Sequence, residues 1–197
     1  EEDYQNPFLP NAKAYYGKSL EEAVFLRKFK NEPGKKFEYQ SGATQMLGFA
    51  IRKSLHKTLA DYASEKFWKP LGMEQNAAWT TDDFGMEKAF CCIHSTSRDF
   101  AKLGQLFLND GKFGDLQILD ASFIEKMRTP TKLSNGIYGL GLWINNDSSL
   151  KHYYFQGLYG QYIIIVPEKN LVIVRTGTNK INVKDAKGRP KQVGFLV

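Results

Sequence analysis

One short stretch of the chain combines residue types that could carry out nucleophilic catalysis. Ser54 and Lys57 have the spacing Ser-x-x-Lys, in which a lysine one helical turn after a serine can help to deprotonate the hydroxyl group. Activation requires that the two side chains come within hydrogen-bond reach in a site that also holds a substrate. The elements around Ser54 therefore decide whether the pair can act.

The surrounding pattern places Ser54 at the wrong end of a helix. Apolar residues recur at helical spacing from Ala43 to Ile51, which predicts an amphipathic helix from about Ser41 through Lys53. Ser54 is then roughly 20 Å from the start of this helix. Thr58 is a good cap for the next helix, so the Ser-x-x-Lys stretch falls in the joint between two helices, and we do not expect Ser54 to be a nucleophile.

A second stretch, "CCIH", contains residue types that bind metals. Cys91, Cys92 and His94 supply only three candidate ligands within four residues, and no second cluster completes a tetrahedral zinc site. We therefore expect buried strand residues here, with no metal site and no cofactor. Adjacent cysteines say little about the redox compartment.

The order of the predicted elements indicates the fold class. Helical patterns dominate up to about residue 128, and Ser19 and Thr58 are expected helix caps. From Tyr138 to Arg175 the chain contains four apolar strand patterns separated by short turns, so neighbouring strands should pair antiparallel. This order predicts an α+β fold, with an antiparallel sheet, flanking helices and a mainly helical segment before it. At least one helix should pack on the sheet through Phe195 and Leu196 or an equivalent apolar face.

Composition limits the kinds of partner. The chain has 197 residues and a net charge of +6, and no apolar run is long enough to span a bilayer. Five basic residues and one acidic residue near the C-terminus supply +4 of that charge: Lys180, Lys184, Asp185, Lys187, Arg189 and Lys191. No nucleic-acid-binding motif accompanies them, so we expect a solvated loop and no nucleic acid partner.

Several blocks, in order, resemble a known family. They are "PGKKFEYQSGATQMLG", "LADYASEKFWKPLGM", "GMEKAFCC", "SRDFAKLGQLFLNDG" and "GLYGQYIIIVPEKNLVIVR". Together they resemble the class C β-lactamase family in its broad sense, from about Pro33 to Thr176. That family includes β-lactamases, D-alanyl-D-alanine carboxypeptidases, esterases and 6-aminohexanoate-dimer hydrolases. The resemblance implies a serine hydrolase acting on a small-molecule amide or ester.

Tyr39, Gln40 and Ser41 match the second motif of that family, Tyr-x-Asn or Tyr-x-Ser. The resemblance implies that the Tyr39 phenol relays protons during acylation and deacylation, with Ser41 as a hydrogen-bonding relay residue. Without the resemblance, the same residues would be interpreted as a tyrosine packed at a helix entry and a serine N-cap.

The third motif is only partly kept. Phe155, Gln156 and Gly157 align with Lys-Thr-Gly or His-x-Gly, and only the glycine is retained. The resemblance implies that Gln156, Gly157 and the Leu158 amide form the oxyanion and substrate-binding strand. Because Phe155 replaces a cation, recognition of a β-lactam carboxylate is in doubt. Trp79 and Phe84 are candidates for a wall of the substrate cleft, the alternative being packing or lid residues.

The first motif, Ser-x-x-Lys, should precede the tyrosine by roughly a hundred residues according to the resemblance, and only 38 residues precede Tyr39. We therefore expect residues 1–197 to be one partial hydrolase domain that lacks its nucleophile and the end of its C-terminal helix, and to be inactive alone. The resemblance also implies a cell-envelope or secreted setting. The chain does not indicate its oligomeric state.

Two alternatives to a hydrolase remain open. One is a non-catalytic relative that binds a ligand or peptidoglycan, which the phenylalanine in the third motif favours. The other is a basic surface-binding module built on the segment from Lys184 to Lys191.

Overall fold

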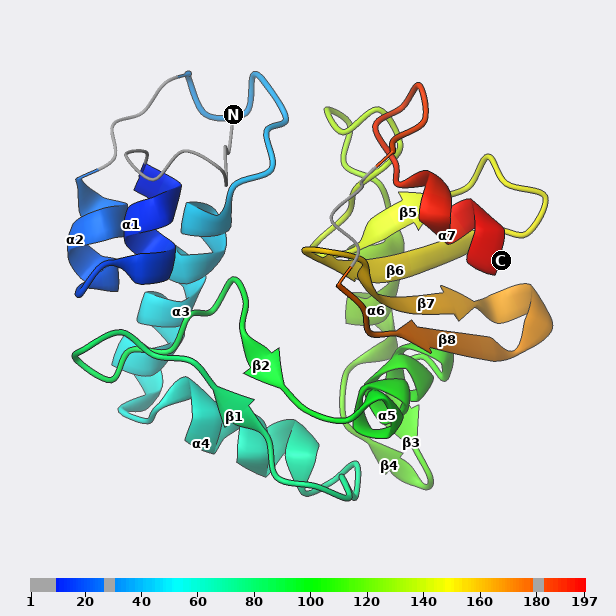
Figure 1. Cartoon of the computed structure of the whole chain (residues 1–197). Helices are drawn as coiled ribbons and strands as arrows, with labels where there is room; N and C mark the ends of the chain where they lie inside the picture. The colour runs from blue at the N-terminus through cyan, green and yellow to red at the C-terminus, as the bar shows by residue number, and fades with distance from the viewer. Residues whose placement is uncertain (1–9, 27–30, 179–182) are drawn as a thin grey trace. The chain divides into compact units, whose positions relative to one another are not determined.

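A computed structural model of the chain describes residues 10–26, 31–178 and 183–197, shown in Figure 1. The chain forms two units: unit 1 comprises residues 1–66 and 76–94, and unit 2 comprises residues 67–75 and 95–197. Each unit is described on its own. No helix among the described residues has the length and hydropathy needed to cross a bilayer.

Unit 1 consists of short helices and one small strand pair. Its elements are α1 (Pro10–Tyr16), α2 (Leu20–Phe25), α3 (Ser41–Leu55), α4 (Leu59–Ala63), β1 (Ala78–Trp79) and β2 (Ile93–His94). The π-helical turn η1 (Ser64–Trp68) continues α4 into unit 2. As predicted, Ser19 caps α2 by accepting a hydrogen bond from the Glu22 amide, and Thr58 caps α4 by accepting one from the Asp61 amide.

Unit 2 is built on an antiparallel sheet. Its elements are α5 (Ser97–Leu108), β3 (Lys112–Phe113), β4 (Leu116–Gln117), α6 (Ala121–Arg128), β5 (Trp143–Asn145), β6 (His152–Gly157), β7 (Gln161–Val166), η2 (Pro167–Lys169), β8 (Leu171–Arg175) and α7 (Lys191–Leu196). Among the described residues the main sheet has the order β5-β6-β7-β8, and every neighbouring pair is antiparallel. The predicted α+β fold and sheet are confirmed.

The sheet is covered on both faces because its central strands alternate between two apolar clusters. Tyr153 belongs to a cluster with Phe107 of α5, whereas the next residue, Tyr154, belongs to a cluster with Val193 of α7. Helix α5 lies close to β7 and β8 at Gly104: a Cβ atom there would be 2.5 Å from a methyl carbon of Val172. This position requires glycine.

Helix α7 packs on the sheet as expected, but not through the predicted phenylalanine. Val193 is buried and Leu196 packs in the same cluster, whereas Phe195 is 87% exposed. Successive helical residues are about 100° apart, so Phe195 points away from the face that Val193 buries. The predicted helix packing is therefore confirmed through an equivalent apolar face formed by Val193 and Leu196, without Phe195.

The basic C-terminal segment is also more ordered than a solvated loop. Lys180 lies outside the described residues, but Lys187 and Arg189 form ion pairs with Asp147, both at 2.8 Å. Arg189 also pairs with Asp185 at 2.8 Å, and its side chain is largely buried. These acidic partners neutralise part of the charge that suggested a surface-binding module.

Candidate functional site

Tyr39 and Ser41 flank the start of α3, the longest helix of unit 1 among the described residues. The helix begins at Ser41, and Gln40 is the N-cap residue in an extended conformation, with φ −141° and ψ 117°. In an extended segment, the side chains on either side of a given residue point to the same side of the backbone, which favours this arrangement for Tyr39 and Ser41. Ser41 is buried and Tyr39 is partly exposed, so a fixed backbone carries a phenol that solvent can reach. Ser41 is not the N-cap, which corrects the structural alternative for this residue.

Polar contacts within unit 1 hold α3 in place. The Gln45 side chain is fully buried; its amide donates to the Glu87 carbonyl at 3.0 Å and accepts from the Ala89 amide at 2.8 Å. Close contact here depends on a glycine one turn further on: a Cβ atom at Gly48 would be 2.7 Å from the Cβ of Ala89. The loop containing Glu87 and Ala89 therefore fixes α3, and with it the backbone of Tyr39 and Ser41.

Gln156, Gly157 and Leu158 lie together at the end of β6 in unit 2. Gly157 pairs with Gln161 across the β6–β7 hairpin, and a Cβ atom at Gly157 would be only 3.0 Å from the Cβ of Gln161. Gln156 is half-buried, and within the described chain its Oε1 atom has no hydrogen-bond partner. An unpaired buried acceptor is costly, so this oxygen is a candidate contact for a ligand group or a water molecule.

Two side chains that the sequence did not single out brace this hairpin. The Arg175 guanidinium donates to the Gly160 carbonyl. The Gln161 side chain donates to the Gly177 carbonyl and accepts from the Gly177 amide, the latter at 3.0 Å. The only sequence signal for the contact between Gln161 and Gly177 is a polar glutamine at the start of an otherwise apolar strand.

Phe155, at the first position of the third motif, is part of the core. Its ring makes an edge-to-face contact with Phe107 of α5, with centroids 5.0 Å apart. A side chain packed against α5 cannot also hold a substrate carboxylate. The strand therefore presents backbone and a glutamine, but no cation, at the positions of this motif.

Trp79 and Phe84, the candidate cleft residues, are both in unit 1 and have different surroundings. The Trp79 indole donates to the carbonyls of Lys88 and Cys91, both at 3.0 Å, and its ring packs against the core of unit 1. These contacts give Trp79 a structural role. Phe84 is exposed on a turn that the Asp82 carboxylate stabilises by accepting from the Phe84 amide at 2.9 Å. A contact with substrate stays a prediction for both residues.

The "CCIH" stretch differs from expectation. Cys91 and Cys92 form a disulfide with each other. They are half-buried and precede the strand β2, so the expectation of buried strand residues was wrong. No cluster of three or more His, Cys, Asp or Glu side chains suited to a metal ion occurs in the described ranges.

Ser54 lies at the end of α3, and Lys57 forms an ion pair with a different residue. Ser54 is in the last turn of α3, and His56 follows as the C-cap in the left-handed conformation, with φ 50°. The Lys57 ammonium binds both carboxylate oxygens of Glu65, at 2.7 and 2.9 Å. The lysine is thus engaged by an acid eight residues further on, and the helix ends between it and the serine.

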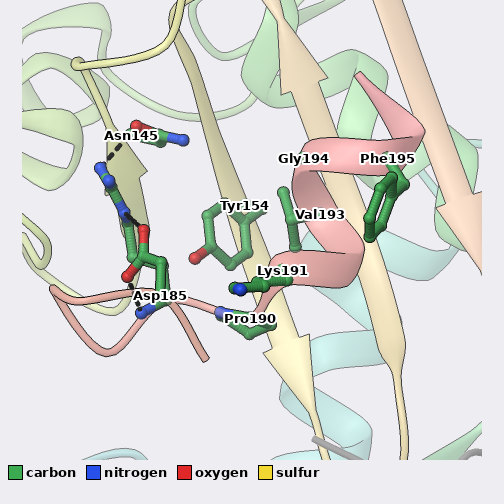
Figure 2. Close-up of a pocket in the computed structure, with 9 residues that line it drawn as sticks. Asn145, Tyr154, Asp185, Pro190, Lys191, Val193, Gly194 and Phe195 are labelled. Carbon is green, nitrogen blue, oxygen red and sulfur yellow. Dashed lines mark hydrogen bonds and ion pairs between the residues drawn. The ribbon is translucent and has the colours of Figure 1, made fainter. Parts of the chain in front are cut away.

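Unit 2 also contains a cavity of about 290 Å³ beside α7, shown in Figure 2. Tyr154 points its hydroxyl group into this cavity, and no hydrogen-bond partner for that oxygen is found in the described ranges. Burial raises the pKa of Tyr154, so its phenol stays neutral at neutral pH. The charge of Arg189 in the wall is already balanced by Asp185 and Asp147. This cavity therefore lacks the activated groups that hydrolysis requires.

Comparison with known proteins gives one family and several relatives. The family model described as "Beta-lactamase" matches residues 2–195. A protein of Escherichia coli O157:H7 assigned as a D-alanyl-D-alanine carboxypeptidase is 24% identical, over 73% of this chain and 45% of its own length. The chain thus spans less than half the length of this curated relative.

Two solved structures with the same fold are also similar to this chain. A Bacillus anthracis protein assigned as a 6-aminohexanoate-dimer hydrolase has a TM-score of 0.81 and 28% identity, covering 93% of this chain and 52% of that one. A β-lactamase from Mycobacterium bovis has a TM-score of 0.61 and 18% identity, covering 77% of this chain and 60% of that one. At that identity the second likeness shows the fold alone.

Proposed function

The chain belongs to the beta-lactamase family, and from that premise we propose that Tyr39 and Ser41 of unit 1 and, independently, the end of β6 in unit 2 have roles in a serine hydrolase. The observation that carries this proposal is the Tyr-x-Ser pair at the start of α3, with Ser41 buried and Tyr39 reachable from solvent. A residue that relays protons needs a well-held backbone and a side chain that a substrate can reach, and Tyr39, which is 37% exposed beside the start of α3, fits this role.

In the proposed reaction the serine oxygen attacks the substrate carbonyl carbon and a C–O bond forms. Tyr39 takes the serine proton and passes it to the leaving nitrogen or oxygen as the bond to the leaving group breaks. Water then attacks the acyl-enzyme, the serine recovers a proton, and the acid product leaves. Ser41 would hydrogen-bond the relay group. The Leu158 amide would donate to the oxyanion, a contribution of about 2.7 to 4 kcal/mol for one such donor.

The substrate we propose is a linear amide or ester without a carboxylate at the third-motif position. Phe155 packs against Phe107, so no cation stands there to bind an anionic group. The likeness to the Bacillus anthracis protein assigned as a 6-aminohexanoate-dimer hydrolase supports an amide as the bond that is cleaved.

The proposal assigns the nucleophilic serine and its lysine to chain outside these 197 residues. Two observations support this assignment. Lys57 is paired with Glu65, and Ser54 is separated from it by the left-handed end of α3. The chain also spans only 45% of the curated relative and 52% of the Bacillus anthracis structure.

A non-catalytic ligand-binding relative is the second candidate function. The observation that favours it is again Phe155, a core residue in place of a polar motif residue. An inert full-length protein that still bound its ligand would support this candidate over the hydrolase.

The test of the hydrolase is Tyr39→Phe in the full-length protein. We expect turnover of an activated ester, p-nitrophenyl acetate, to fall by about 10² or more, the usual scale for a positioned acid or base, with an unchanged melting temperature. Tyr16→Phe is the matched control, because this tyrosine is strongly exposed. Equal activity in both variants would exclude the relay role, and a matching loss of folding would mark Tyr39 as structural.

The isolated chain tests the position of the nucleophile. We expect no covalent adduct when the 197-residue chain is treated with a fluorophosphonate, as measured by intact-protein mass spectrometry. A stoichiometric adduct that disappears in Ser54→Ala would overturn the assignment of the serine to another part of the polypeptide.

A further inference from the structure

The disulfide of unit 1 joins two residues, Cys91 and Cys92, that the peptide bond already connects. A disulfide stabilises a fold mainly by closing a loop in the unfolded chain, and its contribution grows with the length of that loop. Adjacent residues close the shortest loop that a disulfide can. The bond therefore holds no two distant segments together, and its effect is confined to the backbone of these two residues and to the groups which that backbone contacts.

The conformation of Cys92 shows where this effect acts. Its φ angle is 72°, in the left-handed region that few residues other than glycine adopt, apart from Asn, Asp and His. The ring closed by the disulfide includes the peptide bond between the two cysteines, so the covalent bond restricts the backbone of Cys92. Opening the ring removes that restriction and lets Cys92 return to an ordinary conformation.

Backbone groups of the cysteine pair are bonded to β1 and to the residue that follows it. The Cys92 carbonyl accepts from the Thr80 amide at 3.1 Å, and the Cys91 carbonyl accepts from the Trp79 indole at 3.0 Å. The φ angle of Cys92 sets the direction of the first of these carbonyls relative to the other. A large change in that angle therefore cannot preserve both hydrogen bonds.

The loop of residues 87–92 also carries the contacts that hold α3. The Cys91 amide donates to the Lys88 carbonyl at 3.0 Å, which closes a turn around Ala89. Within this turn the Ala89 amide donates to the Gln45 side chain at 2.8 Å, and that side chain donates to the Glu87 carbonyl at 3.0 Å. A rearrangement of the cysteine pair is thus passed directly to the residues that bind α3.

We propose that the Cys91–Cys92 disulfide is a redox switch, opened by a dithiol, that controls how firmly loop 87–92 holds β1, α3 and, through α3, the backbone of Tyr39. Both cysteines are half-buried and are not sealed in the core, which leaves the pair open to a small reductant. The closed form has the hydrogen bonds described above, and the open form loses them.

The switching step is thiol–disulfide exchange. A thiolate of the reductant attacks one sulfur of the pair, the Sγ–Sγ bond breaks, and a mixed disulfide forms. The second thiol of the reductant then displaces the protein sulfur and closes the reductant's own disulfide. The protein pair gains two electrons and two protons, and the dithiol loses the same number. Because both thiols stay on adjacent residues, an oxidised reagent of the same class can close the pair again.

The first test is whether the folded protein opens. The full-length protein is treated with dithiothreitol in native buffer and then with iodoacetamide, and mass spectrometry counts the alkyl groups on the peptide that contains Cys91 and Cys92. We expect both cysteines to be alkylated after reduction and neither before it. A pair that is reduced only after guanidinium has unfolded the protein would overturn the switch.

Hydrogen exchange then shows what opening does. Reduction should speed exchange at the Thr80 and Ala89 amides by at least about tenfold, because their partners are displaced, and should leave the β7 amides of unit 2 unchanged. Unchanged rates at Thr80 and Ala89 in fully reduced protein would overturn the proposal. An equal rise at the β7 amides would also overturn it, because it would mark a general loss of stability.

A matched pair of variants isolates the backbone of Cys92. Cys92→Gly and Cys92→Ser both remove the disulfide, but only glycine adopts a left-handed conformation without steric cost. We expect exchange in Cys92→Gly to match the oxidised protein and exchange in Cys92→Ser to match the reduced protein, with no response to dithiothreitol in either. Identical exchange in the two variants would show that this conformation does not transmit the switch.

The effect on Tyr39 rests on the proposed function, and the same two variants separate the two ideas without a thiol that could react with the ester. Full-length Cys92→Ser should hydrolyse p-nitrophenyl acetate at least about tenfold more slowly than Cys92→Gly, because a displaced acid or base loses its alignment. Different exchange with no hydrolysis by any form supports the switch and counts against the hydrolase. Equal hydrolysis by both variants supports the hydrolase and overturns the control of its site by the disulfide.

Discussion

Apolar side chains from a sheet and three helices fill the interior of unit 2, whereas unit 1 combines a smaller apolar cluster with buried polar side chains. In unit 2, Ile164 and Ile165 alternate between two apolar clusters on opposite faces of β7. In unit 1, Gln45 and Glu87 are buried and connect α3 and α4 to one loop, while the apolar face of α3 is exposed.

The two units therefore use their apolar surface differently. The sheet of unit 2 has a helix packed on each face, so its apolar surface is already used. Unit 1 combines an apolar cluster with specific hydrogen bonds, and several apolar side chains of α3 are exposed. We therefore expect side-chain truncations in the two units to act through different physical mechanisms.

The largest effect should come from the apolar core of unit 2. Ile164→Ala removes a fully buried side chain from β7, and we expect the free energy of unfolding to fall by about 2 to 5 kcal/mol. Chemical denaturation measures this loss, and hydrogen exchange at β6 and β7 amides locates it. Leu171→Ala on β8 is the control, since that side chain is exposed. Similar losses in both variants would show that burial in this sheet does not decide its stability.

A smaller effect is expected from the polar interior of unit 1. Gln45→Ala leaves the Glu87 carbonyl and the Ala89 amide without their partner, at a cost of about 1 to 3 kcal/mol. Faster hydrogen exchange at the Ala89 amide should accompany this loss. Thr44→Ala, an exposed neighbour on α3, should leave both measurements nearly unchanged. If the two variants behave alike, polar contacts do not hold this unit together and the contrast between the units fails.

The smallest effect should be a pH dependence that arises in unit 2. Burial lowers the pKa of His152, and the positive charge of Arg189 lowers it further, although the hydrogen bond between Nδ1 and the Leu150 carbonyl acts in the opposite direction. The unfolded chain then binds more protons than the folded one. The stabilisation is complete above the unfolded pKa of about 6.5 and is lost as pH falls through that value towards the lower folded pKa.

His152→Asn should abolish this dependence, because asparagine can donate to the same carbonyl and does not titrate. Unfolding free energies measured between pH 8 and pH 5 should decline for the unmodified chain, with a slope of at most about 1.4 kcal/mol per pH unit, and should be flatter for the variant. A replacement of the exposed His94 by asparagine should keep the decline. A decline that persists in His152→Asn would assign the titration to another group.

Features that depend on neighbouring residues were predictable from the sequence. It predicted that Ser19 and Thr58 cap helices, that a helix begins at Ser41, and that the strands from Tyr138 to Arg175 pair as an antiparallel sheet. Caps and hairpin turns are formed by residues a few positions apart, so their signals are complete within a short stretch of chain. The motif around Tyr39 and the family were also predicted from such stretches.

Tertiary structure decided which of two available faces each element buries. Apolar side chains of α3 are exposed, whereas Gln45 is buried because it binds a loop more than 40 residues away. No local sequence pattern predicts that contact. Arg189 was expected in solvent and instead pairs with Asp147, which is 42 residues distant. Amphipathic periodicity shows only that a helix has two unlike faces; which face is buried depends on contacts between residues far apart in the sequence.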